Sequence, residues 1–123
     1  MIRGYLHTAI VVRDLAAARQ FYEGILGLIP VERSLKFPGI WYQIGNSQLH
    51  LMATSAPQSA LVNAEKWGRN PHIAFAVDDI TALKTTLTAQ HYSFQVSASG
   101  RAALFVRDPD GNVIELSAAP SST

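Results

Sequence analysis

The stretch HTAIVVRDLAA at residues 7–17 returns later in the same chain as HIAFAVDDITA at residues 72–82. The two stretches carry the same residue at His7 and His72, Ala9 and Ala74, Val12 and Val77, Asp14 and Asp79, and Ala17 and Ala82. At the same offset His50 aligns with Glu115. The repeat indicates that the chain consists of two copies of one structural unit. Each copy has a potential metal ligand near its start and another near its end.

The bulk composition is that of a compact globular domain. The chain has 123 residues, of which 48% are hydrophobic and 15% are charged, and this length suits one domain. The formal net charge is +1 and no run of Lys or Arg occurs, so we expect no nucleic-acid partner. Cysteine is absent, so a metal would have to be bound by His, Asp or Glu. No apolar run has the about 20 residues that span a bilayer, and the start lacks a secretory signal pattern. We therefore expect a cytoplasmic protein without a membrane partner.

Each copy is predicted to run strand, helix, strand, strand, strand. In the first copy Asp14 is a predicted helix N-cap and Gly27 the helix end, and the strands are predicted at 5–12, about 29–36, 40–45 and 47–53. In the second copy Asp79 caps the helix, and the strands are predicted at 71–77, 93–98, 101–107 and 112–118. Residues 108–112, DPDGN, have the composition of a tight turn. The prediction is one domain of two modules, about 1–54 and 70–118, with a linker at 55–69.

Strand periodicity places the candidate ligands on one face of each copy. Side chains alternate between the two faces of a strand, so His72 lies opposite the bulky Ile73 and Phe75. By the same count His50 and Glu115 lie on the face opposite the neighbouring large aliphatic residues, and so does His7. The four candidates would converge only if two such sheets curl toward each other.

These four residues predict a metal site held by His7, His50, His72 and Glu115. Three imidazoles and one carboxylate suit Ni, Zn, Mn, Co or Fe(II). Without His50, the remaining two histidines and one glutamate form a set that is typical of Fe(II) oxygen chemistry. Glu115 is also the candidate catalytic residue, because it can stay a ligand or act as a general base. The alternative is that each histidine is an ordinary packed or surface side chain.

Candidate substrate-binding residues follow from the same alternation of side chains. Trp41 and Gln43 share one face of their strand, as do Arg101, Phe105 and Arg107 in another, and either set is expected to face the cavity. Arg13 has the same strand parity as His7. Lys36, Arg69 or Arg101 would bind an anionic group of the substrate. The alternative for any one of them is that it is solvated or pairs with Asp or Glu.

Four segments resemble the vicinal oxygen chelate superfamily, which includes glyoxalase I, fosfomycin-resistance proteins, extradiol dioxygenases, methylmalonyl-CoA epimerase and bleomycin-resistance proteins. The matching segments are HTAIVVRDLAAARQFYEGILGL, WYQIGNSQLHLM, PHIAFAVDDI and ALFVRDPDGNVIELS. The resemblance implies an α+β fold of two βαβββ modules whose mixed sheets curl into an open barrel. It implies one divalent metal ion, held by ligands from the first and last strand of each module. It also implies a small-molecule substrate with vicinal oxygens, and a homodimer.

Departures from the family patterns bear on the reaction. Val11 stands where glyoxalase I usually has an arginine, four residues after the first ligand. No Lys or Arg follows Arg107, whereas fosfomycin-resistance enzymes carry basic residues beyond the last glutamate. Epimerase-like members have a glutamine at the position of His50 and need further acid/base carboxylates, for which Glu32 is the obvious candidate. Extradiol dioxygenases are usually longer, four-module chains.

The leading functional hypothesis is a metal-dependent lyase, isomerase or dioxygenase. The alternative is a non-catalytic drug- or metabolite-binding protein like the bleomycin-resistance proteins, for which Trp41, Phe37 and Trp67 would provide aromatic walls. A purely structural module has no positive feature in the sequence.

Overall fold

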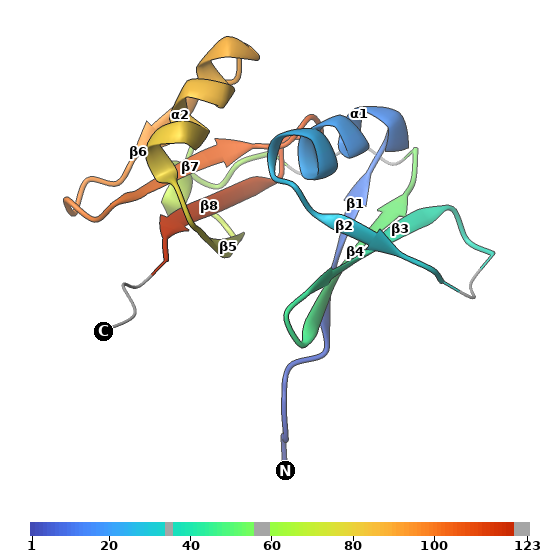
Figure 1. Cartoon of the computed structure of the whole chain (residues 1–123). Helices are drawn as coiled ribbons and strands as arrows, with labels where there is room; N and C mark the ends of the chain where they lie inside the picture. Colours follow the sequence, from blue (N-terminus) through green and yellow to red (C-terminus); the bar gives the residue numbers. More distant parts are fainter. Residues whose placement is uncertain (34–35, 56–59, 120–123) are drawn as a thin grey trace. The chain divides into compact units, whose positions relative to one another are not determined.

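The computed structural model describes residues 1–33, 36–55 and 60–119 (Figure 1). It divides into two units, Met1–Gln58 and Ser59–Thr123, and each contains one βαβββ module, as predicted. Within the described residues, no helix is both long and apolar enough to cross a membrane.

The first unit is a four-stranded mixed sheet with a helical segment on one face (Figure 1). The strand order is β1-β4-β3-β2, so the first strand pairs with the last, in parallel, and the other pairs are antiparallel. Its elements are β1 (His7–Val12), α1 (Leu15–Arg19), η1 (Gln20–Ile25), β2 (Ile29–Val31), β3 (Gly39–Ile44) and β4 (Ser47–Ala53).

The helical segment of the first unit begins and ends where the sequence predicts. The Asp14 carboxylate accepts hydrogen bonds from the backbone amides of Ala16 and Ala17 at 2.9 and 3.3 Å, and Gly27 closes the segment with a φ of 74°. From Gln20 onward, however, the backbone is a π-helix, in which the amide of Leu26 donates to the carbonyl of Phe21. The wider turn accompanies the complete burial of the consecutive side chains Phe21 and Tyr22, a local packing requirement that hydrophobic periodicity does not reveal.

Strand β2 is shorter than the predicted strand at 29–36. Only Ile29–Val31 pairs with β3, and the Arg33 side chain turns back toward the carbonyl of Gly39 at 3.4 Å. The backbone therefore leaves the sheet before Arg33. Residues 34 and 35 of the predicted strand lie outside the described part of the chain.

The second unit repeats the same topology. The strand order is β5-β8-β7-β6, with β5 and β8 parallel and the other pairs antiparallel. Its elements are η2 (Trp67–Arg69), β5 (His72–Val77), α2 (Ile80–Ala89), β6 (Phe94–Val96), β7 (Ala103–Arg107) and β8 (Val113–Ala118). Asp79 caps α2 by accepting from the amide of Ala82. The predicted turn at 108–112 is also confirmed, because Asp108 accepts from the amides of Asp110 and Asn112.

Residues 63–70, most of which we expected to be linker, pack on the sheet of the second unit. The buried Asn70 side chain ties the segment together: its amide nitrogen donates to three backbone carbonyls and its oxygen accepts from the amide of Asn63. The amide of Trp67 donates to Gln95 in β6 at 2.9 Å. Gly68 lies so close to the Phe105 ring that a Cβ there would be 2.6 Å from Cζ. The short 3-10 helix η2 therefore covers part of β7.

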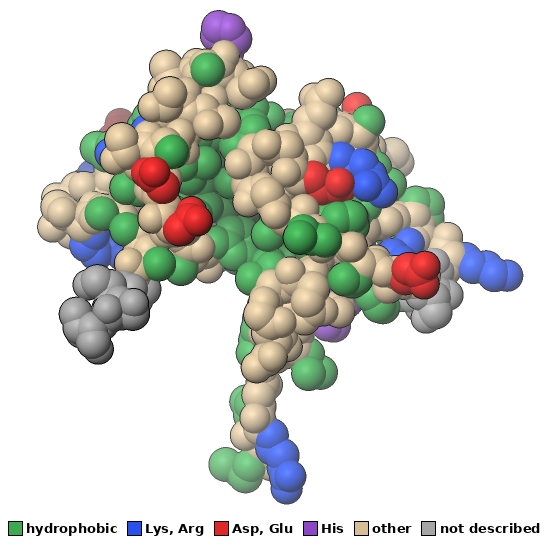
Figure 2. Space-filling model, in the orientation of Figure 1, with side chains coloured by type: hydrophobic (Ala, Val, Ile, Leu, Met, Phe, Trp, Pro, Cys, Tyr) green, Lys and Arg blue, Asp and Glu red, His purple; other side chains and the backbone are tan. Residues whose placement is uncertain are grey.

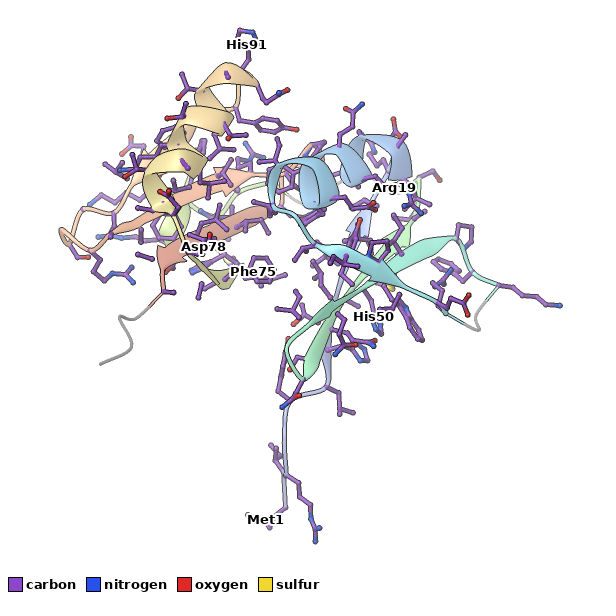
Figure 3. All side chains as sticks on the ribbon, viewed as in Figure 1. Met1, Arg19, His50, Phe75, Asp78 and His91 are labelled. Carbon is purple, nitrogen blue, oxygen red and sulfur yellow. The ribbon has the colours of Figure 1, made fainter. Side chains whose placement is uncertain are left out.

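Each sheet buries one face beneath its own helical segment. In the first unit the buried side chains alternate with the candidate ligands, as predicted, and include Val12, Ile40, Tyr42, Leu49 and Leu51. Figure 3 shows His50 on the sheet face that is turned away from the helical segment. In Figure 2, acidic and basic side chains are interspersed on the visible surface of each unit, and neither sign forms a continuous patch.

Gly39 tests the packing of this sheet. A Cβ at Gly39 would collide with the backbone carbonyl of Leu51, whereas a Cβ at Gly24 would meet nothing within 4 Å. We expect Gly39→Ala to lower the free energy of unfolding by about 1–3 kcal/mol because a backbone clash forces the strands apart. Gly24→Ala is the control and is expected to change it by less than about 1 kcal/mol. Urea unfolding followed by circular dichroism measures both, and equal stabilities of the two variants would contradict the close approach.

Candidate metal site

The candidate ligands of the second unit contact each other. His72 begins β5, and Glu115 lies in the middle of the neighbouring strand β8, opposite Ala74. Nε2 of His72 is 3.2 Å from Oε1 of Glu115, and the two side chains are 25% and 11% exposed. The shared face of two parallel strands thus brings together a carboxylate and an imidazole that are 43 positions apart in sequence.

The hydrogen bond at Nδ1 of His72 determines whether Nε2, the atom that faces Glu115, carries a hydrogen or a lone pair in the neutral ring. Nδ1 lies 2.6 Å from the backbone carbonyl oxygen of Asn70, and a carbonyl oxygen can only accept. Nδ1 therefore carries the hydrogen, and Nε2 of the neutral ring holds its lone pair toward Oε1 of Glu115. Two acceptors that face each other at this distance attract only when a cation, either a proton or a metal ion, lies between them.

Two further side chains hold Glu115. The hydroxyl of Ser117 donates to Oε2 at 2.9 Å, and Nη1 of Arg101 lies 3.4 Å from the same oxygen. Burial raises the pKa of Glu115, but the hydrogen bond from Ser117 and the charge and hydrogen bond of Arg101, together with the charge of His72 when its ring is protonated, outweigh it and lower the pKa below its usual value. The carboxylate is therefore anionic at neutral pH.

In the first unit the corresponding histidines form a ring stack. The ring centroids of His7 and His50 are 4.0 Å apart, and their planes differ by 16°. Trp41, the cross-strand partner of His50, stacks on His50 at 4.2 Å and 8°. The guanidinium of Arg33 lies over the Trp41 ring, 5.8 Å from its centroid. The predicted residues Trp41, His50 and His7 therefore form one layered cluster across three strands.

A chain of glutamine hydrogen bonds fixes the tautomer of His50. The Gln43 amide nitrogen donates to the backbone carbonyls of Gly45 and Ser47, which only accept, so its Oε1 must accept from Gln48 at 2.8 Å. The remaining oxygen of Gln48 then accepts from Nε2 of His50 at 2.7 Å. The hydrogen of neutral His50 is consequently on Nε2. Burial, followed by the neighbouring His7 and Arg33, lowers the pKa of His50 below 6.5, so the neutral ring is the prevailing form at neutral pH.

The other predicted substrate-binding residues differ in their surroundings. Phe105 meets the edge of His72 at 5.6 Å between ring centroids, and Arg101 adjoins Glu115 with a side chain that is 56% exposed. Arg107 lies against the 108–112 turn, where its Nε donates to the carbonyl of Gly111. Arg13 is exposed just beyond β1.

Sequence reasoning missed three residues that position the candidate ligands. Ser117 and Gln48 each lie two positions from a candidate ligand on the same strand and face, so the period of two could have identified them. Asn70 acts through its backbone carbonyl, which has no signature in the sequence.

The candidate ligands lie as two pairs, one in each unit. Among the residues that the structure describes, no three or more His, Asp or Glu side chains are grouped so as to hold a metal ion. The donor chemistry of the second pair nevertheless fits a divalent cation. A histidine ligand characteristically donates its other ring N–H to a backbone carbonyl, as His72 does to Asn70.

Ser117 tests the electrostatics of the pair. A carboxyl group with a lowered pKa in the folded state adds stability above its unfolded pKa, near 4.5, and that stability is lost as the pH falls through the folded pKa. In the metal-free protein we expect Ser117→Ala to raise the pKa of Glu115, because the variant loses the hydroxyl donor. Ser117→Thr keeps a hydroxyl and is the control. NMR titration of the Glu115 carboxyl carbon measures the shift, and an unchanged midpoint in Ser117→Ala would contradict it.

The comparison with known proteins agrees with this architecture. Glyoxylase I 4 from Arabidopsis thaliana is 26% identical over 117 residues, which cover 89% of this chain and 67% of the relative. Human mitochondrial methylmalonyl-CoA epimerase is 28% identical over 125 residues, covering 89% and 70%. The structure of the fosfomycin resistance protein FosX from Listeria monocytogenes has a TM-score of 0.77 at 19% identity, covering 98% of this chain and 94% of that one. This last likeness concerns the fold alone.

The sequence model of one family matches nearly the whole chain. It covers residues 4–116, which include both modules and all four candidate ligands. The chain therefore belongs to the Glyoxalase/Bleomycin resistance protein/Dioxygenase superfamily.

Proposed function

We propose that this chain is a divalent-metal-dependent enzyme, a glyoxalase-like lyase or isomerase or a dioxygenase, that acts on a small substrate with vicinal oxygens. The observation that carries the proposal is the pair of acceptors in the second unit. Nε2 of His72 faces Oε1 of Glu115 at 3.2 Å while its Nδ1–H is engaged by Asn70. The names of the two relatives described above, a Glyoxylase I and an epimerase, support an enzymatic role.

The proposed ligands are His72 and Glu115 with one or both histidines of the first unit, His7 and His50. This set suits Ni, Zn, Mn, Co or Fe(II). When bound, such an ion supplies Lewis-acid stabilisation of negative charge on a substrate oxygen. The carboxylate offsets part of the charge of the ion, and the neutral imidazoles contribute lone pairs.

Glu115 is better suited to hold a cation than to remove a proton. Its carboxylate already accepts from Ser117 and adjoins Arg101 and His72, and its pKa is lowered, which weakens it as a base. A general base acting at neutral pH needs the opposite shift. We therefore assign Glu115 the role of an anionic ligand.

Arg101 is the proposed receptor for an anionic group of the substrate. Its side chain is 56% exposed, yet its Nη1 lies only 3.4 Å from Glu115. An exposed guanidinium beside a ligand can pair with a carboxylate or phosphate without giving up a buried contact. The Phe105 ring beside His72 adds an apolar contact at the same place.

Metal content tests the proposal directly. We expect about one ion per chain in wild-type protein that has been loaded with Ni, Mn, Fe(II) or Zn and desalted, measured by plasma mass spectrometry. His72→Ala and Glu115→Ala are expected to lose the ion, because each removes one of the two facing acceptors. His91→Ala, at the exposed end of α2 (Figure 3), is the control and should retain it. Failure of the wild-type protein to retain any of these metals would favour the metal-free binding protein instead.

We also propose that the chain forms a homodimer, as its resemblance to glyoxalase-like proteins implies. Sedimentation equilibrium is expected to give twice the chain mass of 13.4 kDa. A monomer at all concentrations would contradict this part of the proposal without affecting metal binding.

A further inference from the structure

The two modules differ at equivalent positions of the repeat. In the second unit the first-strand histidine and the last-strand glutamate meet through a nitrogen and an oxygen. In the first unit the equivalent His7 and His50 meet face to face. His50 therefore has an imidazole where its repeat equivalent Glu115 has a carboxylate. Its contact with the first-strand histidine is between ring faces, whereas that of Glu115 is between a nitrogen and an oxygen.

Stacked imidazoles cannot serve the same metal ion. The lone pair of an imidazole nitrogen lies in the plane of its ring, so a bound ion lies close to that plane at about 2.1 Å from the nitrogen. The stacked planes of His7 and His50 differ by only 16°. Because these planes are nearly parallel, they intersect much farther from the two rings than the length of a metal–nitrogen bond. An ion therefore cannot lie in both planes at bonding distance. Only one of the two rings can therefore be a ligand in this arrangement.

The contacts of His50 hold its ring in place. Trp41 and His7 both stack on it at about 4 Å between centroids, and two rings at such distances must occupy opposite faces. Its Nε2–H is bound by Gln48, whose own orientation is fixed through Gln43 by backbone carbonyls. Reorienting His50 toward an ion would break the stack on both faces and the hydrogen bond together.

His7 has the properties expected of the ligand. It is exposed, and within the described residues no hydrogen bond engages its ring nitrogens. Its only ring contact among those residues is the stack on His50. It is also the repeat equivalent of His72, which presents a lone pair to Glu115. The stack leaves the nitrogens at the edge of the His7 ring available for bonding.

We infer that His50 is a positioning residue that orients the His7 ring by stacking, rather than a fourth metal ligand. The inference rests on the proposed metal-dependent function. It reduces the ligand set to His7, His72 and Glu115, two imidazoles and one carboxylate. Trp41, Gln43 and Gln48 then act as a scaffold that holds His50, and substrate binding is not needed to explain them.

Three variants separate the ring of His50 from its nitrogens. His50→Phe keeps a flat ring that can stack but has no donor atom, His50→Ala removes both, and His7→Phe removes the assigned ligand. The probe is Ni²⁺ added to metal-free protein, with affinity measured by competition with a chelator. We expect His50→Phe to bind within about threefold of wild type, His50→Ala to lose about 10–100-fold, as for a residue that supports a ligand, and His7→Phe to lose more than His50→Ala.

A count of bound imidazoles gives a second readout. Pulsed EPR of the Cu²⁺-loaded protein is expected to report the same number of coordinating imidazoles in wild type and His50→Phe, and one fewer in His7→Phe. Loss of one imidazole in His50→Phe, or a loss of affinity equal to that of His50→Ala, overturns the inference while leaving the metal-dependent function intact. If wild type binds neither Ni²⁺ nor any of the other metals named above, the proposed function fails and the inference fails with it. Circular dichroism confirms that each variant is folded.

Discussion

The parallel pairing of the first and last strands of each module is the constraint on which the rest of the structure depends. It joins β1 to β4 and β5 to β8, so residues from opposite ends of a module lie side by side. Because side chains alternate, every second residue of these strands faces away from the helix. The pairing therefore provides a second face, turned away from the helix, on which two distant residues meet. The helix on the other face stabilises the pairing by burying the intervening aliphatic side chains.

What occupies that face then decides the chemistry of each module. A carboxylate opposite an imidazole gives two acceptors that a cation can join, as at Glu115 and His72. An imidazole opposite an imidazole gives a stack, as at His50 and His7. The residues around Glu115 and around His50 also differ in chemical type. Charged and hydroxyl donors surround the carboxylate, whereas an aromatic ring and amide groups surround the stacked histidine. One backbone design thus supports two kinds of side-chain interaction.

Much of the fold and part of the site follow from sequence patterns alone. The repeat predicts two modules, the helix caps predict where Asp14 and Asp79 lie, and the period of two places the candidate ligands on one face, because each depends on neighbours in sequence. The π-helix at Gln20–Ile25 and the segment at 63–70 depend instead on packing between distant residues. The stack of His7, His50 and Trp41 requires side-chain conformations that no pattern specifies. The period of two predicts on which face of the sheet a side chain lies, but it does not predict the orientation of that side chain's ring.

Asn70 illustrates how backbone and side chain can have separate roles at one position. Its carbonyl oxygen accepts from His72, while its side-chain contacts all go to residues 63–67. In a mutational scan, substitutions of Asn70 would impair the protein. That result would suggest that the side-chain amide of Asn70 is part of the candidate metal site. The sensitivity would have another origin. Loss of the amide would loosen the anchor of the loop, and the carbonyl, which every substitution retains, would drift away from the imidazole. Sensitivity to mutation here measures the anchoring of the main chain, not the chemistry of the residue.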